Sequence, residues 1–162
     1  MRPSTTVRAT YPAGTVEVPV KPGPGYEWDE ASGTWIALSR PAPTADDLKA
    51  HLAALRFDVE TGGLTVGTME IATDRDSQGK ILAARVKAAD DPDFTTTWKA
   101  LNGWFVLDAT AIVALSDAVL AHVAACFSAE ESTAQAVDAG TVTTQVEIDA
   151  AFAGALETAS NA

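Results

Sequence analysis

Proline is concentrated in the first part of the chain. Seven of the eight prolines fall within residues 1–43, together with four of the eleven glycines. Proline fixes φ and has no backbone N–H, so a helix cannot be maintained through closely spaced prolines. We therefore predict that residues 1–43 form a Pro/Gly-rich arm and that residues 44–162 form the folded domain.

Within the arm, a short aromatic segment predicts a small β-hairpin. The runs Tyr26–Trp28 and Thr34–Leu38 flank a five-residue turn, Asp29–Gly33, that ends in glycine. Each strand carries one tryptophan, Trp28 or Trp35. An isolated two-stranded hairpin is only marginally stable in water. We expect this one to dock on the main domain or on a neighbouring subunit.

The remainder of the chain alternates between helical and hairpin patterns. Three threonines are each followed, three residues later, by an acidic residue, a typical helix start. The expected elements are a helix from Thr44, a hairpin from Phe57 to Ile71 that turns at Thr61–Gly63, a helix from Thr73 to about Ala89, a hairpin from Phe94 to Leu107, a helix from Asp108 towards Gly140, and a helix from Thr144. The fold class is therefore α+β: a proline-rich N-terminal arm with a small β-hairpin, then a compact domain of about four helices and two β-hairpins.

Asn102-Gly103 is the strongest turn signal in this domain, because a type I′ turn needs positive φ at both central residues. A two-residue loop at this position pairs Leu101 with Trp104. The face expected to be buried then carries four residues: Trp98, Ala100, Phe105 and Leu107. Trp104 lies on the other face, where it covers a second layer or contacts a partner.

The longest predicted helix carries one apolar stripe, made of Ile112, Leu115, Val119, Val123 and Cys126. Cys126 is the only cysteine, so no disulfide can form within the chain. No apolar run is expected to approach the roughly 20 residues of a membrane span, and the first residues lack the apolar core of a signal peptide. We expect a soluble protein, made in the cytoplasm, with no membrane insertion.

The net charge of −11 is distributed unevenly. Residues 1–43 carry four basic and four acidic side chains, so the whole excess lies in the rest of the chain. No lysine or arginine follows Lys99, whereas eight acidic residues do. Nucleic acids and anionic lipids are bound through clustered lysine and arginine. Direct binding to either is therefore not expected.

Candidate metal sites lack the required ligands. Residues 74–79 resemble the opening of a calcium loop, but the glutamate that such a loop needs at its twelfth position is replaced by Arg85. The two histidines, His51 and His122, lie on different predicted helices, and a zinc site needs at least three good ligands. A helix start and structural histidines account for these residues.

Patterns of catalytic residues are equally incomplete. His122 and Cys126 are one helical turn apart, but a thiol buried in an alanine-rich helix stays protonated. No nucleophile elbow, phosphate-binding loop or dinucleotide fingerprint occurs. The acidic runs 90–93 and 130–131 are interpreted as solvated turns and helix surface. We predict no catalytic, cofactor-binding or metal-binding residue, and no enzyme activity.

Tryptophan remains as the residue type with functional potential. All four tryptophans fall on predicted hairpins, where strand packing is their usual role. Exposed tryptophan is a frequent anchor of protein interfaces. The candidate partner contacts are Trp28, Trp35 and Trp104.

Leu48 to Leu156 resembles a phage and prophage tail-protein family, the family of domain of unknown function 4376. The residues that carry the resemblance are Leu48-Lys49-Ala50, Ile71–Gln78 with Ile81, Trp98-Lys99, Asn102-Gly103-Trp104 with Leu107-Asp108, Ala121-His122-Val123 with Phe127, and Gly140–Thr144 with Ile148–Ala150. The arm is more loosely similar to the Pro/Gly-rich starts of tail-fibre proteins, through Gly25–Trp28 and Thr34-Trp35. The family has no described catalytic residues.

The resemblance implies a structural component of a bacteriophage tail: a fibre, baseplate or tail-tip accessory protein located in the virion. Its expected partners are other phage tail proteins and further copies of itself, with a trimer suggested by analogy to tail fibres. Two alternatives stay open at this point. One is a tail-fibre assembly chaperone absent from the mature virion, and the other is a small glycan-degrading hydrolase with converging carboxylates.

Overall fold

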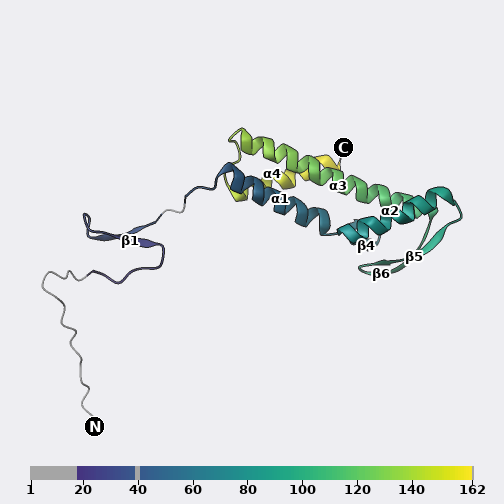
Figure 1. The fold of residues 1–162 in the computed structure, drawn as a ribbon, viewed down its shortest axis with the longest axis horizontal. Helices are drawn as coiled ribbons and strands as arrows, with labels where there is room; N and C mark the ends of the chain where they lie inside the picture. The colour runs from purple at the N-terminus through teal and green to yellow at the C-terminus, as the bar shows by residue number, and fades with distance from the viewer. Residues whose placement is uncertain (1–17, 39–40, 162) are drawn as a thin grey trace, which may run out of the picture. The chain divides into compact units, whose positions relative to one another are not determined.

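The computed structural model describes residues 18–38 and 41–161. The chain divides into two units, Met1–Pro41 and Ala42–Ala162 (Figure 1). The part of the predicted arm that precedes Val18 lies outside the described residues. The sequence places the boundary between the two parts two residues later, after Pro43.

The first unit contains the predicted hairpin. Strands β1 (Tyr26–Asp29) and β2 (Thr34–Ala37) pair antiparallel, with Trp28 opposite Trp35. The turn between them is closed by the Asp29 carboxylate, which accepts hydrogen bonds from the backbone N–H groups of the next residues, and by Gly33 at φ 64°. A positive φ of this size favours glycine. The hairpin prediction is confirmed.

The second unit contains four helices and two hairpins in the predicted order, which confirms the α+β class. Its elements are α1 (Ala45–Thr61), β3 (Leu64–Val66), β4 (Met69–Ile71), α2 (Arg75–Asp90), β5 (Thr95–Ala100), β6 (Gly103–Asp108), α3 (Ala109–Asp138) and α4 (Gln145–Ser160). Each pair of consecutive strands forms its own antiparallel two-stranded sheet. Consecutive antiparallel strands need no long crossover.

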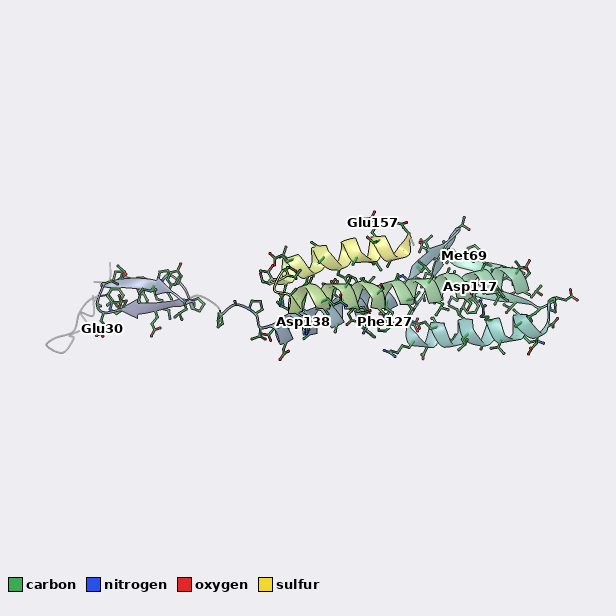
Figure 2. All side chains as sticks on the ribbon, turned by 90° about the horizontal axis from the view of Figure 1, so that it is seen from above. Glu30, Met69, Asp117, Phe127, Asp138 and Glu157 are labelled. Atoms are coloured by element: carbon green, nitrogen blue, oxygen red, sulfur yellow. The ribbon has the colours of Figure 1, made fainter. Side chains whose placement is uncertain are left out.

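Helix α3 is the central element of this unit. It packs against α1, α2 and α4, and Figure 2 shows α2 and α4 beside different parts of it. Two apolar clusters share it. The first joins α2 and the hairpins to the N-terminal half of α3: Ile71, Ile81, Ala88, Ala100, Leu107, Ala109, Ile112, Leu115 and Val119. The second joins α1 and α4 to its C-terminal half: Leu48, Leu52, Ala129, Val137, Val142, Ile148 and Phe152.

One expectation about α3 was wrong. By length and composition this helix could cross a membrane, although we expected no apolar run of that size. Alanine supplies much of its apolar character, and an alanine-rich stretch is easily overlooked beside runs of leucine and valine. In the structure α3 packs against three other helices, and 28% of its most apolar window is buried within the protein.

The first strand and the turn predicted for the second hairpin were wrong, because the whole hairpin lies within the predicted return strand, Leu64 to Ile71. Helix α1 continues to Thr61, so Phe57 and Val59 are helical instead of forming a strand. Gly63, at φ 104°, lies in the link that follows the helix, and the hairpin turns at Gly67, with φ 61°. The two-residue spacing of Phe57 and Val59 was interpreted as the alternation of a strand. It does not determine the structure here, because Val59 packs against the second cluster from within the helix.

The start of α2 also differs from the prediction. Asp74, and not Thr73, is the N-cap, and its carboxylate accepts hydrogen bonds from the N–H groups of Asp76 and Ser77. Thr73 is fully buried, and its hydroxyl donates to the carbonyl of Glu60 at 2.6 Å. A non-local hydrogen bond has therefore taken over the hydroxyl that the sequence assigned to the cap.

The register of β5 and β6 is shifted from the predicted one. Trp98 pairs with Phe105 and Lys99 with Trp104, so the loop is Leu101–Asn102. Asn102 has no positive φ, and its side chain links this loop to the other hairpin through the N–H of Glu70 and the carbonyl of Thr68. A shift by two residues keeps every side chain on its predicted face. The predicted buried face is therefore confirmed, with Ala100 and Leu107 buried and Trp98 and Phe105 packed against the core.

The apolar packing of α3 can be tested with two leucines on the same helix. Leu115 is 1% exposed and Leu120 is 68% exposed. We expect Leu115→Ala to lower the free energy of unfolding by about 2 to 5 kcal/mol, because it leaves a cavity in the first cluster. Leu120→Ala is expected to change it by no more than about 0.5 kcal/mol. Urea denaturation of both variants measures the difference, and equal effects would contradict the assigned packing.

The capping box of α4 predicts a pH dependence of stability. Thr144 and Glu147 form the predicted box. Hydrogen bonds from the backbone N–H of Thr143, from its hydroxyl and from Thr144 hold the pKa of the Glu147 carboxyl below its usual value. Because the folded pKa is depressed, the stabilisation is present above the unfolded pKa, near 4.5, and is lost as pH falls through the folded pKa. Glu147→Gln should therefore lower the urea midpoint at pH 7 more than at pH 3, and an equal loss at both would refute this.

Candidate functional site

The tryptophans of the first unit form one aromatic pair. The rings of Trp28 and Trp35 meet edge to face, with centroids 5.4 Å apart and an interplanar angle of 69°. The Trp35 indole N–H donates to the carbonyl of Pro19 at 2.7 Å, and the Lys21 ammonium lies 5.7 Å from the ring centroid. Edge-to-face pairs stabilise by about 0.5 to 1.5 kcal/mol beyond their burial. Trp35 therefore links the hairpin to Pro19 and Lys21 of the preceding segment.

The opposite side of this hairpin is open and combines apolar and acidic side chains. Ile36 and Leu38 are both exposed, and together with Trp28, Glu27 and Asp29 they line a shallow depression of about 250 Å³. A two-stranded hairpin has no second layer of its own. Both of its faces therefore present apolar surface within the first unit.

Trp104 lies on the outer face of the β5–β6 hairpin in the second unit. It lies on the face predicted to be opposite the buried one and is 69% exposed, and Val106 beside it is 78% exposed. The Lys99 ammonium lies 5.6 Å from the Trp104 ring centroid, a cation–π arrangement. This outer face is thus an apolar patch with one adjacent positive charge.

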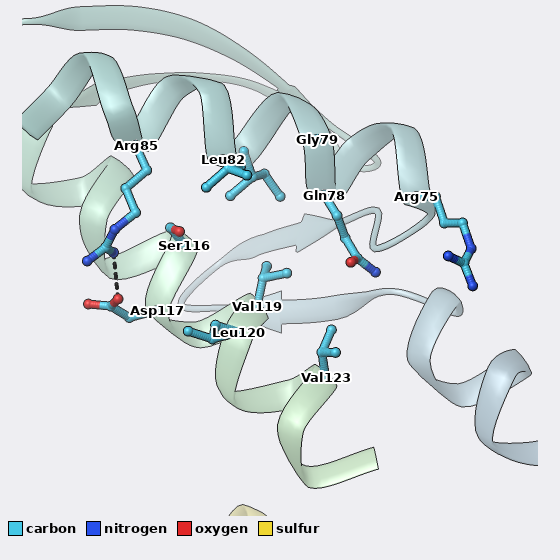
Figure 3. Close-up of a pocket in the computed structure, with 11 residues that line it drawn as sticks. Arg75, Gln78, Gly79, Leu82, Arg85, Ser116, Asp117, Val119, Leu120 and Val123 are labelled. Atoms are coloured by element: carbon cyan, nitrogen blue, oxygen red, sulfur yellow. Dashed lines mark hydrogen bonds and ion pairs between the residues drawn. The ribbon is translucent and has the colours of Figure 1, made fainter. Parts of the chain in front are cut away.

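A groove between α2 and α3 was not predicted from the sequence. It encloses about 530 Å³, and Figure 3 shows Leu82 of α2 facing Leu120 of α3, with Arg75 and Arg85 at opposite ends. Leu82 and Leu120 are both exposed. The Arg85 guanidinium donates to the Asp117 carboxylate at 2.5 Å and to the carbonyl of Val113 at 3.2 Å. The sequence contained one signal, because Leu82 lies beside the buried Ile81 and cannot share its face.

A buried ionic cluster between α1 and α3 was also missed. Arg56, whose side chain is 14% exposed, pairs with Glu60, which is 7% exposed, and its Nε donates to Glu130 at 3.0 Å. The guanidinium also lies 4.7 Å from the centroid of the Phe127 ring. Glu130 had been interpreted as solvated helix surface, and that interpretation was wrong because Arg56 binds it. The Arg56–Glu60 spacing of one helical turn is visible in the sequence, but the partner on α3 is not.

His122 and Cys126 lie close to this cluster. The Cys126 sulfur is 3.9 Å from His122 Nε2, which itself lies 3.2 Å from the carbonyl of Val59. Cys126 is fully buried, and burial, assisted by the Glu60 carboxylate, raises the pKa of its thiol. A protonated, inaccessible thiol is a poor nucleophile. The predicted burial of Cys126 is confirmed.

The other candidate ligands have structural partners. Asp74 caps α2, and the Ser77 hydroxyl lowers the pKa of its carboxyl most strongly. His51 Nε2 lies 2.7 Å from the Asp149 carboxylate and so links α1 to α4. Within residues 18–38 and 41–161, no three histidine, cysteine, aspartate or glutamate side chains converge as a metal site. These side chains are engaged in caps and in contacts between helices.

Comparison with known families identifies the second unit. Residues 42–153 match the family described as domain of unknown function DUF4376, more than half of the chain. The chain belongs to this family. The match begins at the first residue of the second unit, so the family domain and the helical unit coincide at that end. No curated protein and no solved structure matches the chain.

The buried ionic cluster can be tested with two arginines that each face a phenylalanine ring. Arg56→Ala leaves the Glu60 carboxylate buried without its partner, so we expect a loss of about 3 to 5 kcal/mol in the free energy of unfolding. Arg75, which is exposed and lies 5.8 Å from the Phe57 ring, is the matched control. Arg75→Ala should cost about 1 kcal/mol or less. Thermal or urea unfolding that ranks the two variants the other way would contradict this assignment.

Proposed function

We propose that the protein is a non-enzymatic structural component of a bacteriophage tail. In this proposal the proline-rich first unit attaches the protein to another tail protein, and the DUF4376 unit forms the body of the appendage. The tail setting rests on the family resemblance and on the fibre-like Pro/Gly-rich arm described above. The protein would be located in the virion.

The main support comes from the hairpin of the first unit. Its two tryptophans pack against each other on one face. Ile36 in β2 and Leu38, just after the end of β2, are both exposed. Two strands cannot bury both faces by themselves, and an exposed apolar surface of this kind is typical of binding. Residues 1–43 contain four basic and four acidic residues and so have no net charge. Unlike the acidic remainder of the chain, this segment would not repel an acidic partner.

The arrangement of polar residues supports a structural role over a catalytic one. The side chains most capable of chemistry are engaged elsewhere: Cys126 is buried with its thiol pKa raised, His51 is paired with Asp149, and Asp74 caps a helix. Two carboxylates from different helices, Glu60 and Glu130, are both held by Arg56. A glycan hydrolase needs two carboxylates flanking an accessible cleft, and this pair is occupied.

Removal of the first 43 residues tests the attachment role. We expect the truncated protein to retain cooperative unfolding, because both apolar clusters lie in the second unit. We also expect it to be lost from phage particles, because the hairpin with Trp28 and Trp35 would be missing. Mass spectrometry of purified particles, with the full-length chain as reference, measures incorporation.

A double substitution provides a finer control for the deletion. Trp28→Ala with Trp35→Ala removes the aromatic pair while keeping the length of the arm, and it should reduce incorporation in the same direction. Truncated protein present in particles at the full-length level would refute attachment through the arm. Full-length protein absent from mature particles but required for their assembly would instead favour the chaperone alternative.

A further inference from the structure

The second unit is acidic, but its basic residues are unevenly placed. Four of its seven lysines and arginines lie on the single helix α2, whereas α4 and all of α3 carry none. Two of the four, Arg75 and Arg85, stand at the ends of the α2–α3 groove (Figure 3). The groove is therefore an apolar surface bordered by positive charge on an otherwise acidic unit.

Only one of the two groove arginines is neutralised within the chain. Arg85 is paired with Asp117, but no carboxylate of the described residues pairs with Arg75, which lies above the Phe57 ring. Between them Leu82 and Leu120 are exposed, and the space above Gly79 is open, since a side chain added there would meet no atom within 4 Å. An occupant of this groove should have small apolar side chains, so that the two protruding leucines fit against it, and one carboxylate that can pair with Arg75.

Helix α4 presents a surface with these properties. Its buried face holds Ile148 and Phe152, and its outer face carries small residues between an exposed valine and a free carboxylate. The outer residues are Val146, Ala150, Ala153, Gly154 and Glu157. They recur at three- and four-residue spacing, so they form one stripe along the helix. Among the described residues no cation pairs with Glu157, whereas Asp149 is held by His51.

We propose that the α2–α3 groove of one copy of this chain binds the outer face of α4 of a second copy. The lengths agree: Arg75 to Arg85 spans about 15 Å and Val146 to Glu157 about 16 Å, at roughly 1.5 Å per helical residue. With Glu157 placed at Arg75, α4 runs antiparallel to α2. Val146 then reaches the end of the groove near Arg85.

The packing in this arrangement is complementary in shape and in charge. Leu82 and Leu120 protrude, whereas Ala150, Ala153 and Gly154 leave the surface of α4 low, so the backbones can approach closely. The positive end at Arg75 meets the carboxylate of Glu157. Both copies carry the same net charge of −11, and their repulsion is screened beyond about 8 Å at physiological ionic strength. The local contact therefore determines whether the copies associate.

The groove and α4 are different surfaces of the same unit, which constrains the assembly. Each copy offers one of each, so the contact forms twice in a two-fold dimer, repeatedly in a closed ring, or without limit in an open filament. This inference goes beyond the proposed function, because self-association in solution requires no phage particle. Either proposal can fail while the other holds.

Charge reversal on the two surfaces tests the contact in the full-length protein. Sedimentation velocity at physiological ionic strength, over micromolar to submillimolar concentrations, should show an oligomer for the unchanged chain. Arg75→Glu and Glu157→Arg should each weaken the association about three- to tenfold, because each places like charges together. The double variant, Arg75→Glu with Glu157→Arg, should recover it, because the pair is restored in reversed order.

Two further variants separate this contact from general effects of charge and folding. Lys80→Glu makes the same charge change on the opposite side of α2 and should leave the association unchanged. Leu120→Asp should weaken it more than tenfold, because it places a carboxylate in the apolar part of the contact. Circular dichroism and thermal unfolding check that each variant remains folded. If Leu120→Asp unfolds the protein, the variants at the exposed Arg75 and Glu157 still test the contact.

Several results would overturn the proposal. A monomeric unchanged chain at every concentration excludes it. A Lys80→Glu effect equal to that of Arg75→Glu would assign the association to overall charge. An oligomer unaffected by both single reversals would place the interface elsewhere on the molecule. Failure of the double variant to recover would exclude α4 as the occupant.

Discussion

The second unit depends on one helix that is shared by two apolar clusters. The N-terminal half of α3 packs with α2 and the hairpins, and its C-terminal half packs with α1 and α4. Helix α3 therefore contributes buried residues to both clusters and connects them. Alanines such as Ala125 and Ala129 are buried on α3 and allow neighbouring helices to approach closely. They also remove little apolar area from water, since the hydrophobic contribution grows with the area buried. A core of this kind is extended and modest, and it leaves large apolar side chains at the surface.

Polar groups fill the region between the two clusters. Arg56 binds carboxylates from two helices and lies over Phe127, while the hydroxyl of Thr73 ties the end of α1 to the start of α2. Buried charges are tolerated when they are paired and hydrogen-bonded. Their geometry is directional, unlike apolar contact, so they fix the position of α1 along α3. Arg56, Glu60 and Thr73 are thereby committed to the fold.

Sequence patterns predicted what is local and failed where distant segments meet. The caps at Thr44, Asp108 and Thr144 depend on a few adjacent residues and were confirmed, as was the order of the elements. The register predicted for β5 and β6 was wrong because the Asn102 side chain accepts a hydrogen bond from the N–H of Glu70, a residue far from it in the chain. The α2–α3 groove and the Arg56–Glu130 pair were missed for the same reason. The face on which Trp104 lies could be predicted, because a two-residue shift leaves the faces of a strand unchanged.

The surface left by this folding has a consistent character. Apolar side chains are exposed on the first hairpin, on the outer face of β5–β6 and along α2 and α3. Lys99 lies beside the β5–β6 patch, and Arg75 and Arg85 lie beside the patch on α2 and α3. A small domain with an alanine-rich core gains stability mainly by covering such surface with another protein. Catalysis would instead require polar groups held free in an accessible cavity. Among the described residues Cys126 is buried and His51 and Asp74 are hydrogen-bonded, whereas several open surfaces are apolar, in agreement with the proposed role in assembly.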